Sequence, residues 1–177
     1  VTWAASAGAV TYNVYKNNNG LYGYIGQTTA LSFKDQNILA DLSKTPPITN
    51  NPFPGAGDYP GAVSYYEQRR IFAGTINKPQ NFWATRSGTE SDMSYSFPTV
   101  DDDSVVFRVS AREANTIRHI VPLSSLLLLT SSAEWRVSAD VLTPSSAGVK
   151  PQSFIGANNT QPVIVNNNAL FVAARDR

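Results

Sequence analysis

The most constraining feature of this sequence is the shortness of its apolar segments. Nearly every one contains Val, Ile, Thr, Tyr or Phe and is bounded by Gly, Pro, Asn or Ser, which is typical of β-strands joined by turns. The i, i+3, i+4, i+7 spacing of an amphipathic helix is almost absent. The best helical candidate covers only a turn or two, at Asp35–Leu42. The sequence therefore predicts an all-β protein.

The first unit is expected to cover residues 1–43. Asn19 and Gly20 supply the left-handed conformations of a tight hairpin turn. A unit this small buries little apolar surface, so we expect it to lean on another part of the protein. The strands predicted in this unit are Val10–Lys16, Leu21–Gly26 and Thr29–Asp35.

Residues 44–61 are predicted to be a linker. They contain five prolines and three glycines, and proline both fixes φ and removes a donor from a β-ladder. An ordered or extended connection between two domains fits this composition.

Residues 62–177 are predicted to be a β-rich domain. Three similar segments, Ile71–Gly74, Leu126–Leu129 and Leu170–Ala173, recur at spacings of 55 and 44 residues. Such a period with about four strands per repeat is typical of β-propeller blades, and a sandwich built from the same strands fits as well. The predicted strands are Val63–Glu67, Arg69–Thr75, Phe82–Ser87, Val105–Ser110, Ile117–Pro122, Leu126–Ser131, Glu134–Ala139, Ser153–Ala157, Val163–Asn166 and Leu170–Ala174.

The composition excludes several classes of function. Fourteen basic and 13 acidic residues leave a net charge of +1, which lacks the basic footprint of a dedicated nucleic-acid binder. Without cysteine, disulfides, thiolate metal sites and cysteine nucleophiles are excluded, and one histidine excludes a His-rich metal site. The longest aliphatic run, Leu126–Leu129, is too short to span a bilayer and is predicted to be a strand buried on both faces.

Two sets of side chains could carry chemistry. His119 with a serine and Asp140 would make a hydrolase site, but no Gly-x-Ser-x-Gly elbow is present, and His119 alternates with Ile117 and Val121. A structural histidine is the favoured interpretation. Asp101–Asp103 offer oxygen ligands for Ca²⁺ but lack the spacing of an EF-hand loop, so a solvated turn is favoured.

Arginines also recur beside aromatic residues. Stacking on bases with contact to phosphates needs such pairs, whereas cross-strand packing with arginine stems over a sheet explains them equally. At a net charge of +1 the packing interpretation is favoured. The candidate contacts to a partner or to DNA are Tyr65, Tyr66, Arg69, Arg70, Trp83 and Arg86.

Two stretches resemble known families. Trp3, Gly8–Lys16 and Gly26–Thr28 are similar to part of a fibronectin type III module, in which a Trp strand precedes a Tyr-x-Val-Tyr strand. The usual closing strands are replaced by residues 42–47.

The second likeness is to bacteriophage structural proteins. It is carried by Gln68–Thr75, Lys78–Gly88, Ile117–Leu123, Leu129–Ser131 and Glu134–Ser138. These stretches resemble large tail proteins that form the tail tube or nozzle of short-tailed phages. The resemblance implies a β-propeller, of which 116 residues supply only a part, and ring assembly around the DNA exit channel.

We therefore expect a structural component of a phage tail, located in the virion, and not an enzyme. The resemblance implies other tail subunits as partners, a homo-oligomeric ring and transient passage of DNA, while no cofactor, metal or membrane contact is expected. The chain begins at Val1 and its last residues directly follow a predicted strand, so we expect a piece of a larger protein. The alternative is a carbohydrate- or surface-binding β module whose exposed Trp and Tyr rings stack on sugars.

Overall fold

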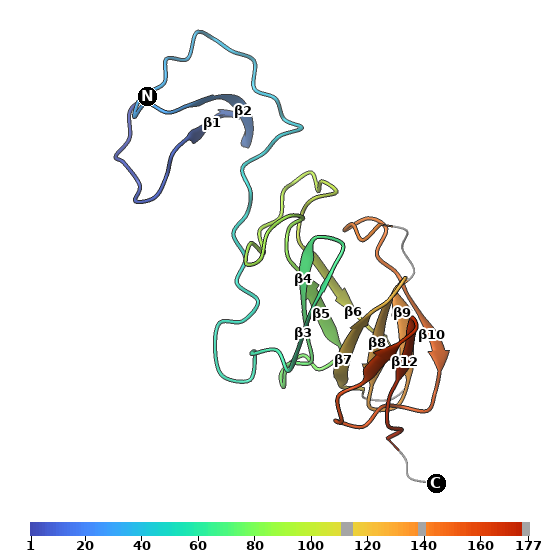
Figure 1. Ribbon diagram of the computed structural model, residues 1–177. Helices are drawn as coiled ribbons and strands as arrows, with labels where there is room; N and C mark the ends of the chain where they lie inside the picture. Colours follow the sequence, from blue (N-terminus) through green and yellow to red (C-terminus); the bar gives the residue numbers. More distant parts are fainter. Residues whose placement is uncertain (111–114, 138–140, 175–177) are drawn as a thin grey trace. The chain divides into compact units, whose positions relative to one another are not determined.

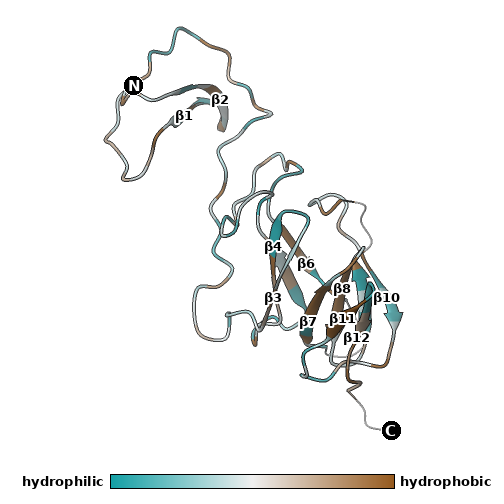
Figure 2. Cartoon of the chain, viewed as in Figure 1, coloured by the Kyte–Doolittle hydropathy of each residue, from teal (hydrophilic) through white to brown (hydrophobic). Residues whose placement is uncertain are grey.

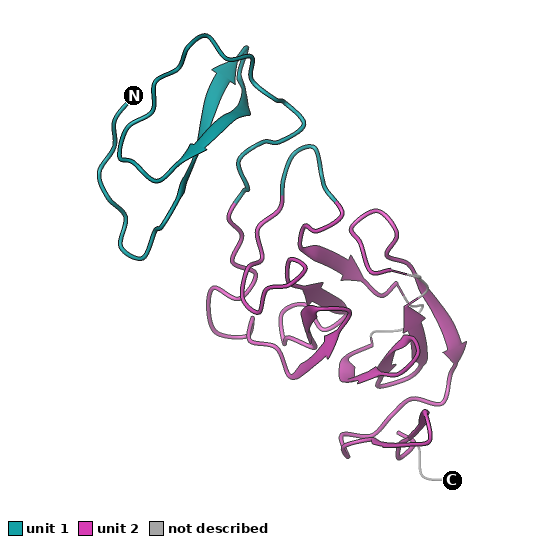
Figure 3. Ribbon diagram, turned by 45° about the horizontal axis from the view of Figure 1, so that its top comes forward, with its two compact units in different colours: residues 1–48, 96–100 teal, residues 49–95, 101–177 magenta. Residues whose placement is uncertain are grey.

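The computed structural model describes residues 1–110, 115–137 and 141–174, and every regular element in these ranges is a β-strand (Figure 1). This confirms the all-β prediction. The chain divides into two compact units (Figure 3). Unit 1 comprises residues 1–48 and 96–100, and unit 2 comprises residues 49–95 and 101–177. The boundary at residue 48 lies inside the predicted linker.

Unit 1 is built on one antiparallel hairpin of β1 (Tyr12–Asn18) and β2 (Leu21–Thr28). Its two-residue turn places Asn19 and Gly20 at φ values of 53° and 91°, the mirror-image turn that matches the twist of paired strands. The side chain of Asn17 accepts a hydrogen bond from the Gly20 amide at 2.9 Å. The two strands are therefore joined where the sequence predicts.

Unit 1 has a thin core. Within its described residues, Ile25 is the one large apolar side chain that is buried, and a lone two-stranded sheet is marginally stable in water. Its likeness to a fibronectin type III module stays a prediction. The large apolar side chains that unit 1 leaves exposed are Val1, Val10, Leu21, Tyr22, Leu31, Ile38, Leu39, Leu42, Ile48 and Phe97.

The predicted strand Thr29–Asp35 is wrong. In this stretch only Ser32 forms a β-bridge, to Thr2, although the backbone amide of Phe33 also donates to the Val1 carbonyl at 3.0 Å. Because so few residues face each other here, the alternating pattern does not become a ladder.

The helical candidate at Asp35–Leu42 does not form a helix. The Asp35 side chain accepts the Ile38 amide at 3.0 Å, and Asn37 has a φ of 62°. Side chains that bond the nearby backbone compete with helical hydrogen bonding. Asp41 instead pairs with Tyr24 through a bridge to β2.

The Lys16–Asp35 ion pair predicts a measurable shift in unit 1. The hydrogen bond from Lys16, 2.8 Å away, and then that from the Ile38 amide lower the pKa of Asp35 below its ordinary value. Because the pKa of Asp35 is lower in the folded unit, the ionised carboxylate stabilises the fold at pH values above its ordinary pKa. This stabilisation is lost as the pH falls through the lowered pKa of the folded state. In a carboxyl ¹³C NMR titration, Lys16→Ala is expected to raise the pKa of Asp35. The pKa of Asp41, lowered by Ser43, should not change; an Asp35 that titrates normally in the unaltered protein would contradict the pair.

Unit 2 contains two four-stranded antiparallel sheets and a C-terminal hairpin. The strand orders are β3-β4-β5-β6 in the first sheet and β7-β8-β9-β10 in the second, so each is a meander of consecutive strands. The C-terminal hairpin is formed by β11 (Val163–Val165) and β12 (Asn168–Leu170). The other strands are β3 (Ala62–Tyr66), β4 (Arg69–Ala73), β5 (Asn81–Ala84), β6 (Val105–Arg108), β7 (Ile117–Pro122), β8 (Leu126–Thr130), β9 (Glu134–Val137) and β10 (Val149–Ser153).

The C-terminal part differs most from the sequence prediction. Strand β10 was not expected. The predicted strand Ser153–Ala157 meets a strand only at Ser153, where β10 ends, and Ala157 makes an isolated bridge to Ala173. Likewise β12 ends at Leu170 rather than continuing to residue 174. β10 carries Pro151 and is mostly exposed, as expected of a sheet edge, where proline removes no needed ladder bond. Its polar sequence, teal in Figure 2, lacks the apolar alternation that predicts strands.

Each sheet of unit 2 has a front and a back face. In the first sheet the front face holds Val63, Tyr65, Arg70, Phe72, Trp83 and Val106, and the back face holds Ala62, Tyr66, Ile71, Ala73, Phe82 and Ala84. In the second sheet the front face holds Ile120, Leu126, Leu128, Trp135 and Val137, and the back face holds His119, Val121, Leu127 and Leu129. Successive side chains alternate between the two faces because the strand period is two.

The main core lies between the back of the first sheet and the front of the second. Ile71, Phe82, Leu126 and Leu128 are each fully buried in this cluster. A second cluster covers the back of the second sheet, where Leu129 packs with residues of the C-terminal segment. The brown strand β8 in Figure 2 is thus buried on both faces, which confirms the prediction for Leu126–Leu129. None of the described residues belong to a helix that could cross a membrane.

Residues 49–61 are ordered against the first sheet. The ring of Phe53 lies 5.3 Å from that of Phe72 and 5.2 Å from that of Trp83, measured between centroids, and so covers the middle of the front face. The Gly61 amide donates to the carbonyl of Ala73 at 3.0 Å. This half of the predicted linker therefore belongs to the packing of unit 2.

Candidate interaction surfaces

The six predicted contact residues all lie on the first sheet or directly after it, but they do not form one surface. Tyr65, Arg70 and Trp83 are on the front face, Tyr66 is on the back, and Arg69 points into the protein. The structure therefore separates them into a front-face pair, a buried anchor, two packed aromatic residues and an arginine in an ion-pair network. In that order they are Tyr65 with Arg70, Arg69, Trp83 with Tyr66, and Arg86.

Tyr65 and Arg70 form the front-face pair, in which the Tyr65 ring is exposed and Arg70 is partly buried. The Tyr65 hydroxyl accepts hydrogen bonds from Nε of Arg70 at 2.8 Å and from a terminal nitrogen at 2.6 Å. The guanidinium also lies 5.2 Å from the centre of the Tyr65 ring and forms an ion pair with Glu90. Since Glu90 neutralises the charge, this corner of the front face presents an exposed aromatic ring rather than a cation.

Arg69 is a buried anchor, with 3% of its surface exposed. It donates to the carbonyl oxygens of Thr85 at 2.7 Å, Asp103 at 2.6 Å and Asp101 at 2.7 Å. Burial lowers the pKa of Arg69, and the nearby carboxylates of Asp102 and Asp103 oppose that shift. Because its donors are engaged with the backbone, Arg69 ties the loop before β6 to β4 and is not available to a partner.

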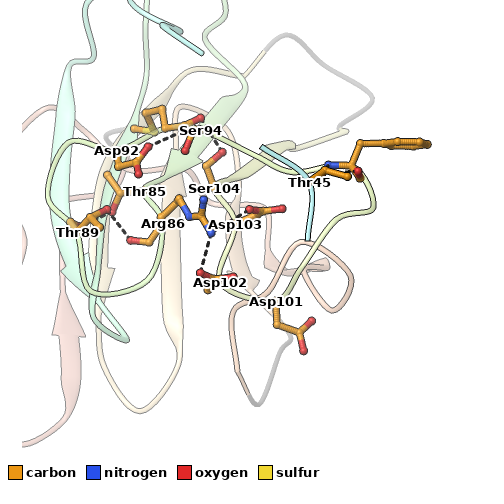
Figure 4. Close-up of polar contacts among 12 residues, drawn as sticks. Thr45, Thr85, Arg86, Thr89, Asp92, Ser94, Asp101, Asp102, Asp103 and Ser104 are labelled. Atoms are coloured by element: carbon orange, nitrogen blue, oxygen red, sulfur yellow. Dashed lines mark hydrogen bonds and ion pairs between the residues drawn. The ribbon is translucent and has the colours of Figure 1, made fainter. Parts of the chain in front are cut away.

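Arg86 pairs with two of the three aspartates that were considered as Ca²⁺ ligands. Its guanidinium contacts Asp102 at 2.7 Å and Asp103 at 3.4 Å, as seen in part in Figure 4. Burial alone lowers the pKa of Arg86, but the hydrogen bond with Asp102 and the charges of both aspartates raise it overall. Asp103 is fully buried. The triplet lies in a turn in which Asp101 and Asp102 are exposed, as the favoured interpretation expected, while Asp102 and the buried Asp103 also form ion pairs with Arg86. Among the described residues no acidic cluster is arranged to hold a metal ion.

The rest of the loop in Figure 4 is held by local polar contacts. The Thr85 hydroxyl donates to the Thr89 carbonyl at 2.7 Å, and the Ser94 amide donates to the Asp92 carboxylate at 2.9 Å. The Ser104 hydroxyl donates to the carbonyl of Met93 at 2.9 Å. These bonds hold the two ends of the long connection between β5 and β6 in place.

The tryptophans of unit 2 are not exposed for stacking. Trp83 is 2% and Trp135 is 6% exposed, the first beneath Phe53 and the second in the main core. The sugar-stacking alternative relied on exposed Trp and Tyr rings, and these two tryptophans do not provide them. The exposed ring among the predicted contacts is that of Tyr65.

Tyr66 closes the first hairpin on the core side. Burial, followed by the charge of the Glu67 carboxylate, raises the pKa of Tyr66. Glu67 in turn accepts the Leu142 amide at 2.6 Å. The first hairpin is therefore tied to a segment 75 residues away.

His119 has a structural contact. Its Nε2 lies 2.8 Å from the carbonyl oxygen of Asn158, and neighbouring Arg118 donates to the Ala157 carbonyl at 2.6 Å. A bulge in β7 between residues 117 and 119 lets both side chains reach the same segment. Asp140, the predicted acidic partner of a hydrolase site, lies outside the described residues.

An apolar surface on the C-terminal hairpin was missed as a candidate site. We define the back face of the hairpin as Val163, Val165, Leu170 and Val172, all of them about half exposed or more. The opposite face carries Ala169 and Phe171, which pack on the second core cluster. The alternation of residues 169–172 was the available signal, but it does not say which of two apolar faces meets the protein.

Comparisons with known proteins add no assignment. No protein-family model matches the chain, and no curated protein is significantly similar to it.

Proposed function

We propose that this chain is a structural assembly module of a bacteriophage tail, acting by contacts between subunits around the DNA exit path. The observation that carries the proposal is the front-to-back stacking of two complete four-stranded meanders followed by a third hairpin. A four-stranded meander is the unit of a β-propeller blade, and radial repetition of such units produces ring-shaped proteins. Part of a propeller is accordingly the architecture we propose for unit 2.

The sequence likeness supports the same proposal. The stretches that resemble tail tube and nozzle proteins lie in the two complete sheets and their connections, from Gln68 to Ser138. The exposed apolar back face of the hairpin adds a surface suited to assembly, since large exposed apolar patches mark interaction sites. A net charge of +1 suits a surface that DNA passes without being retained.

Solution mass and particle shape test this proposal. Sedimentation equilibrium with the 177-residue chain is expected to show concentration-dependent association, and negative-stain electron microscopy is expected to show closed rings. Head-to-tail contacts close into rings when the rotation between subunits allows it. A strict monomer at all accessible concentrations would count against the proposal. The tail location is tested separately by the neighbouring genes, which are expected to encode portal and tail proteins.

A further inference from the structure

The C-terminal hairpin repeats the geometry of the first hairpin of unit 2. The β3–β4 turn has Glu67 and Gln68 at φ values of 47° and 59°, and the β11–β12 turn has Asn166 and Asn167 at 48° and 61°. Both are two-residue turns with paired residues directly on each side. Aligned on these turns, Ile71-Phe72-Ala73 corresponds to Leu170-Phe171-Val172. β11 and β12 are thus equivalent to the first two strands of a four-stranded sheet.

The sheets of unit 2 stack in one direction. The back of the first sheet packs on the front of the second in the main core, as Phe82 and Leu128 show. The back of the second sheet packs on the hairpin face that carries Phe171. By its turn alignment Phe171 corresponds to Phe72, a front-face residue of the first sheet. In both contacts, the back face of one sheet therefore packs against the front face of the sheet or hairpin that follows it in the chain.

The back face of the hairpin is the last face in this stack, and among the described residues of unit 2 no further sheet packs on it. Leu170 and Val172 are 61% and 47% exposed, whereas the equivalent residues Ile71 and Ala73 are fully buried against the second sheet. The segment 141–174 has one charged residue, Lys150. Exposed apolar patches that are not broken up by charges mark interaction sites. This surface lacks the charges that would oppose association.

We propose that the back face of the hairpin docks on the front face of the first sheet of a second copy of the chain. Among the described residues of unit 2, that front face packs against no other sheet of the unit. Phe53 fills its centre, and Val63, Tyr65 and Val106 around it are 54%, 56% and 52% exposed. Continuing the intramolecular front-to-back order across subunits makes the contact heterologous, so that copies join head to tail. This inference rests on the proposed assembly function and names its two surfaces.

Engineered cysteines test the contact without interference from native thiols, because the sequence contains no cysteine. The variants Val63→Cys and Leu170→Cys are prepared separately, mixed and oxidised mildly. Mixing is expected to give mainly one covalent dimer that contains one copy of each variant, while the double variant gives a ladder of higher multimers on a non-reducing gel. Ile76→Cys paired with Leu170→Cys is the control, since Ile76 is 83% exposed and lies on neither face.

The outcomes separate this inference from the proposed function. Covalent dimers from Leu170→Cys alone would mean that two hairpins face each other, which would overturn the head-to-tail contact. Association in the ultracentrifuge without a Val63–Leu170 cross-link would leave the assembly function standing and refute these surfaces. A monomer would refute both. Leu170→Asp, which places a charge on the hairpin face, is expected to weaken association at least tenfold, and Ile76→Asp is expected to leave it unchanged.

Discussion

Replacing Phe82 with alanine is expected to lower the free energy of unfolding by about 3–5 kcal/mol. Phe82 is fully buried on the back face of the first sheet, and its ring centre lies 5.9 Å from that of Phe107. It belongs to the core cluster that both four-stranded sheets share. Truncation removes contacts to both sheets and leaves a cavity, because neighbours fixed in a β-ladder relax only partly. Urea unfolding followed by tryptophan fluorescence measures the loss.

Val106→Ala is the matched control for this prediction. Val106 lies on the neighbouring strand β6, on the front face, and is 52% exposed. Its truncation is expected to cost less than about 1 kcal/mol, since little apolar area is removed from the interior. Equal losses in the two variants would show that the first sheet does not share a core with the second.

The fold class was predictable because strand signals are local. Short apolar segments bounded by turn residues occur wherever the structure has β3 to β9, and the Asn19–Gly20 turn lies where expected. Strand β10 could not be found in this way. As an exposed edge strand with Pro151 at its centre, it is specified by its pairing with β9 and not by an apolar pattern of its own.

The candidate site was harder to predict because each face of β4 carries one arginine and one large apolar residue. Arg69 shares a face with Ile71 and Arg70 shares the other with Phe72, so the sequence does not show which face meets the second sheet. The structure buries Arg69 with Ile71 and leaves Arg70 with Tyr65 on the front. Two adjacent arginines with the same sequence context therefore have opposite roles.

The internal repeat was visible in the sequence only as a likeness. Ile71–Gly74 and Leu170–Ala173 were recognised as similar segments, but their register depends on where the preceding turns lie. The positive φ values locate the two turns, and aligning the hairpins on these turns makes Phe72 equivalent to Phe171. The stacking order of the faces, and hence the open back face, follows from that register.

Arg69 gives the second prediction of large effect. Three backbone carbonyls from two segments, Thr85 before the long β5–β6 connection and Asp101 and Asp103 at its end, accept hydrogen bonds from its guanidinium. A buried carbonyl that loses its donor cannot turn to water, so it keeps the cost of its desolvation. Arginine is suited to this position because its planar fork presents several donors in fixed directions.

Arg69→Met is therefore expected to destabilise the protein by about 3 kcal/mol in urea unfolding, although methionine fills much of the same volume. Arg69→Lys keeps the charge but not the fork, and should recover less than half of that loss.

Hydrogen exchange separates this role from simple packing: the Ser87 amide, which donates to the Asp102 carbonyl at 3.0 Å, should exchange faster in Arg69→Met. Arg70→Met, one residue along on the front face, removes a surface ion pair worth less than about 1 kcal/mol and should leave the Ser87 amide protected. If both methionine variants behaved alike, Arg69 would not be what ties the loop to the sheet.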